Sequence, residues 1–337
     1  MTSGSAPLAV VGGRLLTGLR DVTSDLSALD SSGLWAVVIT FEGVAVCARF
    51  DRAQRARPWP GAPWVGPAPS QWRSSLDQHR FMAGVSAIRE AIARGDVYQV
   101  NLCRVLSAPL PQDADVAALG ARLALGNPAP YSAVVRLPRH GVQVASASPE
   151  RFLARRGQAV ESRPIKGTAA EPTGFQEKDR AENVMIVDLV RNDLGRVCET
   201  GSVRVNALFA VEAHPGLHHL VSTVSGRLRP GAGWADLIAA TFPPGSVTGA
   251  PKEAALTVIS ELEPERRGPY CGAVGWVDAD RRAGDLNVAI RTFWAAEGRL
   301  HFGTGGGITW GSTPEGEWAE TALKARRLLA LASADFE

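Results

Sequence analysis

The chain has 337 residues, with 36 Lys and Arg against 34 Asp and Glu, which gives a formal net charge of +2. This near balance excludes nucleic-acid binding through bulk positive charge. Hydrophobic residues make up 45% of the sequence and support a sizeable core in one large domain or two ordinary ones. The cysteines include no C-x-x-C pair, so we expect buried reduced thiols rather than a zinc site or disulfides.

The N-terminal segment shows no basic region ahead of its first apolar residues. No apolar run approaches the ~18 residues that a membrane span requires. We therefore expect a soluble cytoplasmic protein.

Residues 1–74 carry the weakest signals. The runs 34–40 and 44–50 flank Glu42 and Gly43, which predicts a hairpin. Residues 57–70 are rich in Pro, Gly and Trp, so a connecting loop is favoured over a Pro-rich recognition motif. We divide the chain into a shortened strand and loop region over 1–74 and a catalytic region over 75–337, which together form one integrated domain.

The catalytic region begins with a predicted helix. Ser75 and Gln78 form a capping-box pattern, apolar residues recur on one face, and Gly95 is a natural stop. The pattern then predicts a strand over 98–106, a helix over 113–125 with Gly126 beyond it, and paired strands over 131–137 and 142–147.

Helices and strands continue to the C-terminus. Helices are predicted over 179–193, over 234–241, from Pro251, where proline takes the first helical position, and from Pro314 with Thr313 as cap. Strands are predicted over 202–209, 219–228, 270–277, 286–295 and 300–304. The glycines at 303–307 fit no G-x-G-x-x-G pattern and open no helix, which argues against a dinucleotide fold.

Two of these helices carry pairs of acids three residues apart, Asp179 with Glu182 and Glu317 with Glu320. This spacing places each pair on one helix face. If the two faces met, one carboxylate from each could hold Mg²⁺ through oxygen. The alternative is that the first pair serves the helix dipole and the second a solvated charged face.

A lysine in a Pro/Gly-rich turn completes the candidate chemistry. Lys166 follows Glu150 and precedes the first acid pair, so these two residues are candidates for nucleophile and acid or base. Lys324, Arg291 and the glycine backbone at 305–307 could neutralise an anionic substrate.

Ordered sequence blocks from about residue 75 to 329 resemble the chorismate-utilising enzymes, which include anthranilate, aminodeoxychorismate, isochorismate and salicylate synthases. The blocks include SPERF at 148–152, PIKGT at 164–168, KDRAEN at 178–183, HHLVSTVSG at 218–226, FPPGSVTGAPK at 242–252 and E-x-x-E-x-x-x-K at 317–324. The resemblance implies an α+β fold with two large, mostly antiparallel sheets packed together, helices outside, and a site in the cleft between the sheets.

Two positions discriminate within the family. Gln99 stands where isochorismate and salicylate synthases carry a lysine that activates water, so water addition is disfavoured. Lys166 stands where anthranilate synthases typically carry alanine, and it is characteristic of the aminodeoxychorismate synthase component I subgroup. The resemblance therefore implies conversion of chorismate and ammonia to 4-amino-4-deoxychorismate, on the way to 4-aminobenzoate and folate. Anthranilate synthase component I is the alternative, and a non-catalytic, partner-binding homologue is the rival of another class.

The resemblance also assigns roles to individual residues. Lys166 adds to ring C2, Glu150 protonates the leaving C4 hydroxyl, and His219 lies near the ring. A Mg²⁺ ion is held by Glu182 and Glu320 with support from Asp179 and Glu317. The enolpyruvyl carboxylate is bound by Arg291, Tyr270, Lys324, Gly305 and Gly307, and the ring carboxylate by Thr248, Gly249 and Ala250.

The roles of the histidines and the source of ammonia remain to be assigned. A structural hydrogen bond is the alternative for His219, and the same structural interpretation holds for His214 and His218. The chain shows no G-x-C-x-G glutaminase segment, so the expected ammonia donor is a separate glutamine amidotransferase subunit.

Overall fold

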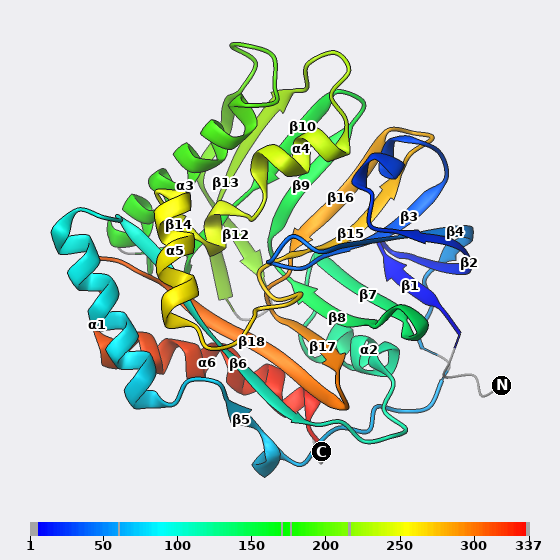
Figure 1. Cartoon of the computed structure of the whole chain (residues 1–337), viewed down its shortest axis with the longest axis horizontal. Helices are drawn as coiled ribbons and strands as arrows, with labels where there is room; N and C mark the ends of the chain where they lie inside the picture. The colour runs from blue at the N-terminus through cyan, green and yellow to red at the C-terminus, as the bar shows by residue number, and fades with distance from the viewer. Residues whose placement is uncertain (1–5, 60, 170, 176, 215–216, 335–337) are drawn as a thin grey trace.

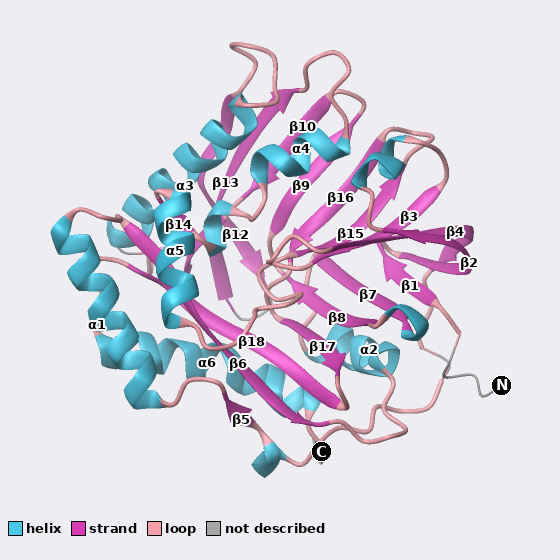
Figure 2. Ribbon diagram, viewed as in Figure 1, coloured by secondary structure: helices cyan, strands magenta, loops and turns pink. Residues whose placement is uncertain are grey.

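The computed structural model describes residues 6–334, apart from 60, 170, 176, 215 and 216. The side chains of Asp179 and His214 lie outside the described part, as do those of 168, 169, 178 and 217. Figures 1 and 2 show two layers of strands with helices around them.

The strands form two antiparallel ladders that meet at β1 (Leu8–Val11). This strand pairs with β2 on one side and with β7 on the other. The larger ladder runs in the order β12 (Arg204–His214), β13 (Leu217–Arg227), β10 (Ala159–Arg163), β9 (Arg151–Arg156), β16 (Ala283–Val288), β15 (Ala273–Asp278), β3 (Leu34–Ile39), β4 (Ala45–Arg55) and β2 (Arg14–Thr23), with β11 (Ile165–Ala169) also on β13. The smaller ladder runs β7 (Tyr131–Leu137), β8 (Val142–Ser148), β17 (Thr292–Ala296), β18 (Arg299–Ile308) and β6 (Gln99–Pro109), with β14 (Gly249–Ala250) and β5 (Arg73–Ser74) on the far edge of β6.

The main hydrophobic core lies between the two ladders, and β7 shows how the sequence builds it. Ala133, Val135 and Leu137 point into this core, whereas Val134 points to the opposite face, where α2 and α6 pack. This alternation follows from the two-residue period of a strand. The predicted α+β fold with two packed antiparallel sheets is confirmed.

Six helices of the described chain cover the sheets. The outer face of the smaller sheet is covered by α1 (Gln78–Arg94), α2 (Val116–Gly126), α5 (Lys252–Leu262) and α6 (Pro314–Ala332). The core continues under α3 (Glu177–Gly195) and α4 (Trp234–Thr241). The predicted loop over 57–70 reaches back to the end of α6, where Trp64 Nε1 donates to the Ala332 carbonyl at 2.8 Å.

The predicted cap of the first helix is wrong by two residues. Asp77, not Ser75, caps α1 and accepts a hydrogen bond from the Arg80 N–H. Ser75 Oγ is used elsewhere, because it accepts from the Val105 N–H of β6 at 3.0 Å. The left-handed Gly95 ends the helix as predicted.

Smaller corrections concern other helix ends. Gly126 is the last residue of α2 instead of lying beyond it, and Pro251 is the N-cap of α5 instead of its first residue. The strands that were not predicted are β1, β2, β5, β9, β10, β11 and β14.

The predicted strand over 286–295 is two strands. The chain leaves β16, which pairs with β9 of the larger sheet, and enters β17, which pairs with β8 of the smaller sheet. A single straight strand cannot serve both ladders, so the backbone turns at Arg291, whose φ is +52°. The break places this arginine at the junction of the two sheets.

A buried ion pair fixes the elements behind the site. Arg267, 1% exposed, donates to the Glu263 carboxylate and also to the carbonyls of Val247 and Asn101, at 2.8 and 2.6 Å. Glu263 additionally accepts from the Cys103 N–H of β6 at 2.8 Å. The pair therefore ties β6 to the turn that precedes β14.

Replacing Arg267 with alanine is expected to lower the free energy of unfolding by about 3–5 kcal/mol, because Glu263 would remain buried without its partner charge. Chemical denaturation measures this change. The exposed Arg94–Asp96 pair supplies the control, and Arg94→Ala should cost less than about 1 kcal/mol. A loss for Arg267→Ala as small as that of the control would contradict the structural role of the pair.

Candidate active site

Residues from both sheets and from two helices converge around Lys166 on β11. Its Nζ lies 3.9 Å from Glu182 Oε2 on α3 and donates to the Ser246 carbonyl at 3.3 Å. Gln99, at the start of β6 and only 1% exposed, donates from Nε2 to the same Glu182 oxygen at 3.3 Å. The side chains of Lys166, Glu182 and Gln99 thus lie next to one another.

Glu150 lies in the link between β8 and β9 and is 3% exposed. Burial raises the pKa of its carboxyl to about 7, against opposing contributions from a hydrogen bond with the Ser246 side chain, the charge of Lys166 and the Ile165 N–H. At neutral pH about half of this carboxyl carries a proton. A buried acid with that pKa can donate a proton near neutral pH.

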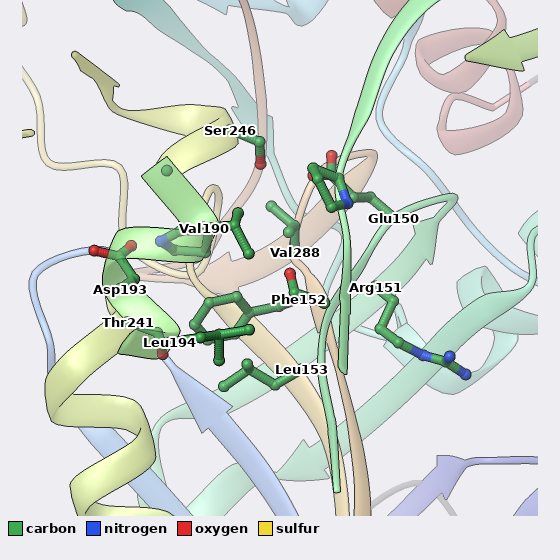
Figure 3. Close-up of a pocket in the computed structure, with 14 residues that line it drawn as sticks. Glu150, Arg151, Phe152, Leu153, Val190, Asp193, Leu194, Thr241, Ser246 and Val288 are labelled. Carbon is green, nitrogen blue, oxygen red and sulfur yellow. The ribbon is translucent and has the colours of Figure 1, made fainter. Parts of the chain in front are cut away.

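A small cavity lies beside Glu150. Figure 3 shows Glu150, Ser246 and Asp193 around it, together with apolar side chains such as Phe152 and Leu194. About 20 Å³ is open to the centre of a water molecule, which suffices for about one water.

Glu182 of α3 lies near enough to Glu317 of α6 for its charge to act on that carboxyl. Burial raises the pKa of the Glu317 carboxyl, and the negative charges of Glu320 and Glu182 raise it further, whereas Ser312 and Lys324 lower it. Ser312 Oγ donates to Glu317 Oε1 at 2.6 Å. The side chain of Asp179 lies outside the described residues.

The donor chemistry of these acids fits Mg²⁺. Glu182, Glu317 and Glu320 offer only oxygen, and a cation between them would relieve the repulsion recorded at Glu317. Within the described part of the chain, no three ligand residues stand close enough to hold an ion by themselves. Mg²⁺ commonly takes one or two carboxylates and completes its shell with water and substrate oxygens.

Arg291 supplies a half-buried positive charge. Burial lowers the pKa of its guanidinium, and no carboxylate of the described chain lies within ion-pair distance of it. A buried charge without a partner is costly, so this position favours an anionic ligand. Its positive φ is a further local strain of the kind found at functional sites.

The glycines of β18 allow the site side chains to approach the backbone. A Cβ on Gly307 would lie 2.1 Å from Gln99 Nε2 and 3.3 Å from Lys166 Nζ. A Cβ on Gly306 would lie 2.8 Å from Glu317 Oε2. The run is therefore a strand under the site, paired with β6, and not a phosphate-binding loop.

Lys324 and Tyr270 both contact β18. Lys324 Nζ donates to the Gly305 carbonyl at 3.0 Å and pairs with Glu320 at 2.6 Å. Tyr270 is 4% exposed, and its ring packs where Gly303 has no side chain. The tyrosine thus lies against the wall of the site.

The predicted ring-carboxylate residues line the other edge of β6. Gly249 and Ala250 pair with Val100 and Gln99. Thr248 is fully buried, and its hydroxyl donates to the Pro244 carbonyl at 3.2 Å.

His219 lies on β13, with the backbone of Thr168 opposite it in the ladder, and it is 2% exposed. It therefore neighbours the strand that carries Lys166.

Two further polar residues, Ser246 and Ser312, contact the predicted groups but were not identified from the sequence. The sequence signal for Ser246 was its position inside the block at 242–252, and the signal for Ser312 was its position shortly before the block at 317–324.

The fold and site define an antiparallel α+β protein in which a half-buried lysine lies near a buried acid, with a half-buried arginine at the junction of the two sheets. The family model described as chorismate binding enzyme matches residues 51–330, and the chain belongs to this family.

Curated relatives carry two different names. The chain is 43% identical over 272 residues to aminodeoxychorismate synthase component 1 of Klebsiella aerogenes and 41% identical to that of Escherichia coli strain K12, in both cases over 77% of this chain and 59% of the relative. It is 41% identical over 312 residues to anthranilate synthase component 1 of Streptomyces coelicolor, over 86% of this chain and 60% of the relative. The matched region thus spans about three fifths of the length of these relatives.

Solved structures share the fold. Anthranilate synthase component I from Streptococcus pneumoniae matches with a TM-score of 0.76 and 26% identity over 89% of this chain and 81% of that chain. A putative 2,3-dihydroxybenzoate-specific isochorismate synthase from Bacillus anthracis matches with a TM-score of 0.81 and 24% identity over 98% and 97% of the two chains. No helix in the described part of this chain is long and apolar enough to cross a membrane.

Replacing Glu150 with glutamine should change how stability depends on pH. The unfolded chain loses this proton near pH 4.5 and the folded chain only near pH 7, so the buried carboxyl destabilises wild type progressively over that range and by a constant amount above it. The variant has no such charge, so its stability relative to wild type should rise by up to about 3 kcal/mol between pH 4.5 and 8.5. Denaturation curves across this range measure the difference.

The control for that series is Glu90→Gln on the exposed face of α1. Its stability relative to wild type should not change with pH by more than about 0.5 kcal/mol. If Glu150→Gln behaves like this control, the carboxyl of Glu150 titrates normally and the burial argument fails.

If chorismate, which the family description names, binds at this site, Gly307→Ala is expected to weaken its binding by about tenfold or more, because the new methyl group would displace Gln99 and Lys166. Calorimetric titration without ammonia measures this binding. Gly311→Ala is the matched control, since a Cβ there meets nothing within 4 Å. Equal affinities for the two variants would show that the close approach at Gly307 does not shape the binding site.

Proposed function

We propose that the chain is the chorismate-converting component of an aminodeoxychorismate synthase, which forms 4-amino-4-deoxychorismate from chorismate and ammonia. The observation that carries the proposal is the amino group of Lys166 in one site with the buried acid Glu150. The similarity to relatives named aminodeoxychorismate synthase component 1 supports it.

The proposed chemistry is a pair of allylic displacements. The Lys166 amine forms a C–N bond at ring C2, both conjugated ring double bonds shift by one position, and the C4–O bond breaks. Ammonia then forms a C–N bond at C4, both double bonds shift back, and the bond between C2 and Lys166 breaks. The enolpyruvyl group stays intact, and one difficult substitution is divided into two easier ones.

Glu150 serves the first displacement as the acid. Its proton passes to the departing C4 oxygen, which leaves as water. With a pKa of about 7, about half of this carboxyl carries a proton at neutral pH, and the charge of Lys166 nearby favours the ionised form that remains after transfer. His219, beside the strand that carries Lys166, is proposed to lie near the ring.

Substrate binding is proposed to use the charged side chains and backbone groups around Lys166. Arg291, with Tyr270, Lys324 and the backbone of Gly305 and Gly307, is proposed to bind the enolpyruvyl carboxylate. Thr248, Gly249 and Ala250 are proposed to lie at the ring carboxylate. Glu182 and Glu320, supported by Glu317 and Asp179, would hold Mg²⁺, which supplies positive charge for the ring carboxylate when bound.

Ammonia is proposed to come from a glutamine amidotransferase subunit. Relatives named component 1 support the existence of a second subunit. The product would feed 4-aminobenzoate and folate synthesis. The free, buried cysteines suit a reducing compartment, so we place the reaction in the cytoplasm.

Anthranilate synthase component I is the second candidate. The relative with that name from Streptomyces coelicolor matches 86% of this chain at 41% identity. Component 1 of the Klebsiella aerogenes aminodeoxychorismate synthase matches 77% at 43% identity, and the aminodeoxychorismate synthase of Streptomyces griseus matches 94% at 38% identity. The two activities differ in product, because anthranilate has lost pyruvate and aminodeoxychorismate has not.

The test combines the purified chain with chorismate, Mg²⁺ and an ammonium salt, and identifies the product by mass and chromatography. We expect aminodeoxychorismate, which becomes 4-aminobenzoate when a lyase is added, and we expect chelation of Mg²⁺ to stop turnover. Anthranilate with pyruvate would favour the second candidate.

Lys166→Ala tests the covalent step. Aminodeoxychorismate formation should fall by at least about 100-fold, because the variant lacks the amine that adds to C2. Lys166→Arg should fail as well, since it keeps the charge but not the nucleophile. Unchanged turnover in either variant would remove Lys166 from the mechanism.

A further inference from the structure

Ser246 occupies a position that the mechanism above leaves without a role. It lies in the short 3-10 turn Gly245–Val247 between α4 and β14, and it is 8% exposed. Its carbonyl accepts the hydrogen bond from Lys166 Nζ at 3.3 Å. Its side chain lines the small cavity together with Glu150, and Figure 3 shows both residues at its rim.

The turn that carries Ser246 is held from three directions. The Val247 carbonyl accepts from the buried Arg267 at 2.8 Å. Gly245 packs against Leu189 of α3, where an added Cβ would lie 3.2 Å from the leucine Cδ2. After the turn, the Thr248 carbonyl accepts from the Asn101 N–H of β6 at 2.7 Å. A residue held this firmly can fix the position of groups that bond to it.

We propose that Ser246 is a positioning residue for the reaction proposed above, on which this inference rests: its carbonyl holds the Lys166 amine, its hydroxyl holds the Glu150 carboxyl, and the rigid turn thereby sets the separation of nucleophile and acid. Lys166 and Glu150 come from different elements, β11 and the β8–β9 link. Ser246 contacts both.

The serine hydroxyl has a second consequence for Glu150. Its hydrogen bond favours the ionised carboxyl and opposes the effect of burial on the pKa. Other charges around Glu150 are Lys166 on β11, the Asp193–Lys252 pair of α3 and α5 at the cavity, and the neighbouring Arg151, which pairs with Asp285 and Glu161. Loss of the hydroxyl alone should therefore move the pKa of Glu150 upward.

The decisive variant is Ser246→Ala, which removes the hydroxyl but keeps the carbonyl. We expect kcat for aminodeoxychorismate formation to fall by about tenfold, from the loss of one hydrogen bond to a charged group. KM for chorismate should change by less than about threefold, because the hydroxyl contacts Glu150 and not the substrate. The descending limb of the kcat profile should move to higher pH, and Ser246→Thr, which restores a hydroxyl, should return most of the kcat.

Thr241→Val is the matched control. Thr241 lines the same cavity, but its hydroxyl donates to the Leu237 carbonyl at 2.7 Å within α4. Its pH profile should match that of wild type. A Ser246→Ala enzyme with unchanged kcat and pH profile, or a Thr241→Val enzyme with the same shift, would overturn the positioning role.

A stability cycle separates this inference from the proposed function. Wild type, Ser246→Ala, Glu150→Gln and the double variant are denatured across pH 4.5 to 8.5 without substrate. If Ser246 acts on Glu150, its removal changes the pH dependence only in the background that keeps Glu150. If removal of the Ser246 hydroxyl changes the pH dependence only when Glu150 is present, and the product is anthranilate, the Ser246 contact is upheld and the proposed activity is overturned. Absence of coupling would overturn the inference whatever the product.

Discussion

The buried pair of Arg267 and Glu263 is the constraint on which the site depends. Removing two charges from water is costly, and here the cost is offset by hydrogen bonds to backbone groups and by the ring of Phe41, which lies 4.3 Å below the guanidinium. Each of those backbone groups belongs to an element that carries site residues. The hydrogen bonds that stabilise the buried pair thus also hold β6 and the Ser246 turn in a fixed relative position. The geometry of the site therefore depends on a structural ion pair.

The site itself is left electrostatically incomplete. Glu150 is buried with a raised pKa, and Arg291 is half-buried without an acidic partner in the described chain. The negative charges of Glu182 and Glu320 raise the pKa of the Glu317 carboxyl. Each of these features lowers the stability of the empty protein, and each would be relieved by an anion at the arginine or a cation among the acids. Such local costs are typical of sites where binding energy is recovered from the ligand, and they distinguish this region from the well-paired core.

The sequence predicted elements whose pattern is set by a single sheet or helix face. Strand β7 and helix α4 were predicted at their observed bounds. The side chains of β7 alternate between two hydrophobic cores, and α4 is a short amphipathic helix between loops. The break at Arg291 could not be predicted, since it arises from the chain crossing between ladders. The acid spacing predicted that each pair shares a helix face, but only the folded chain brings Glu182 of α3 close enough to raise the pKa of Glu317 on α6. Ser246 escaped prediction because its contact with Lys166 uses the backbone carbonyl, which carries no sequence signal.

Overall similarity cannot choose between the two candidate activities. Relatives named aminodeoxychorismate synthase and anthranilate synthase are 43% and 41% identical to this chain. A shared fold positions the substrate, whereas the reaction depends on a few side chains around the ring. Lys166 lies where Glu182, the Ser246 carbonyl and the bare backbone of Gly307 surround its amine. The close approach at Gly307 is informative, because space is reserved there for a long side chain and its partner Gln99. An alanine at position 166 would leave that space empty, so the geometry around the lysine, more than the degree of identity, favours chemistry in which its amine takes part.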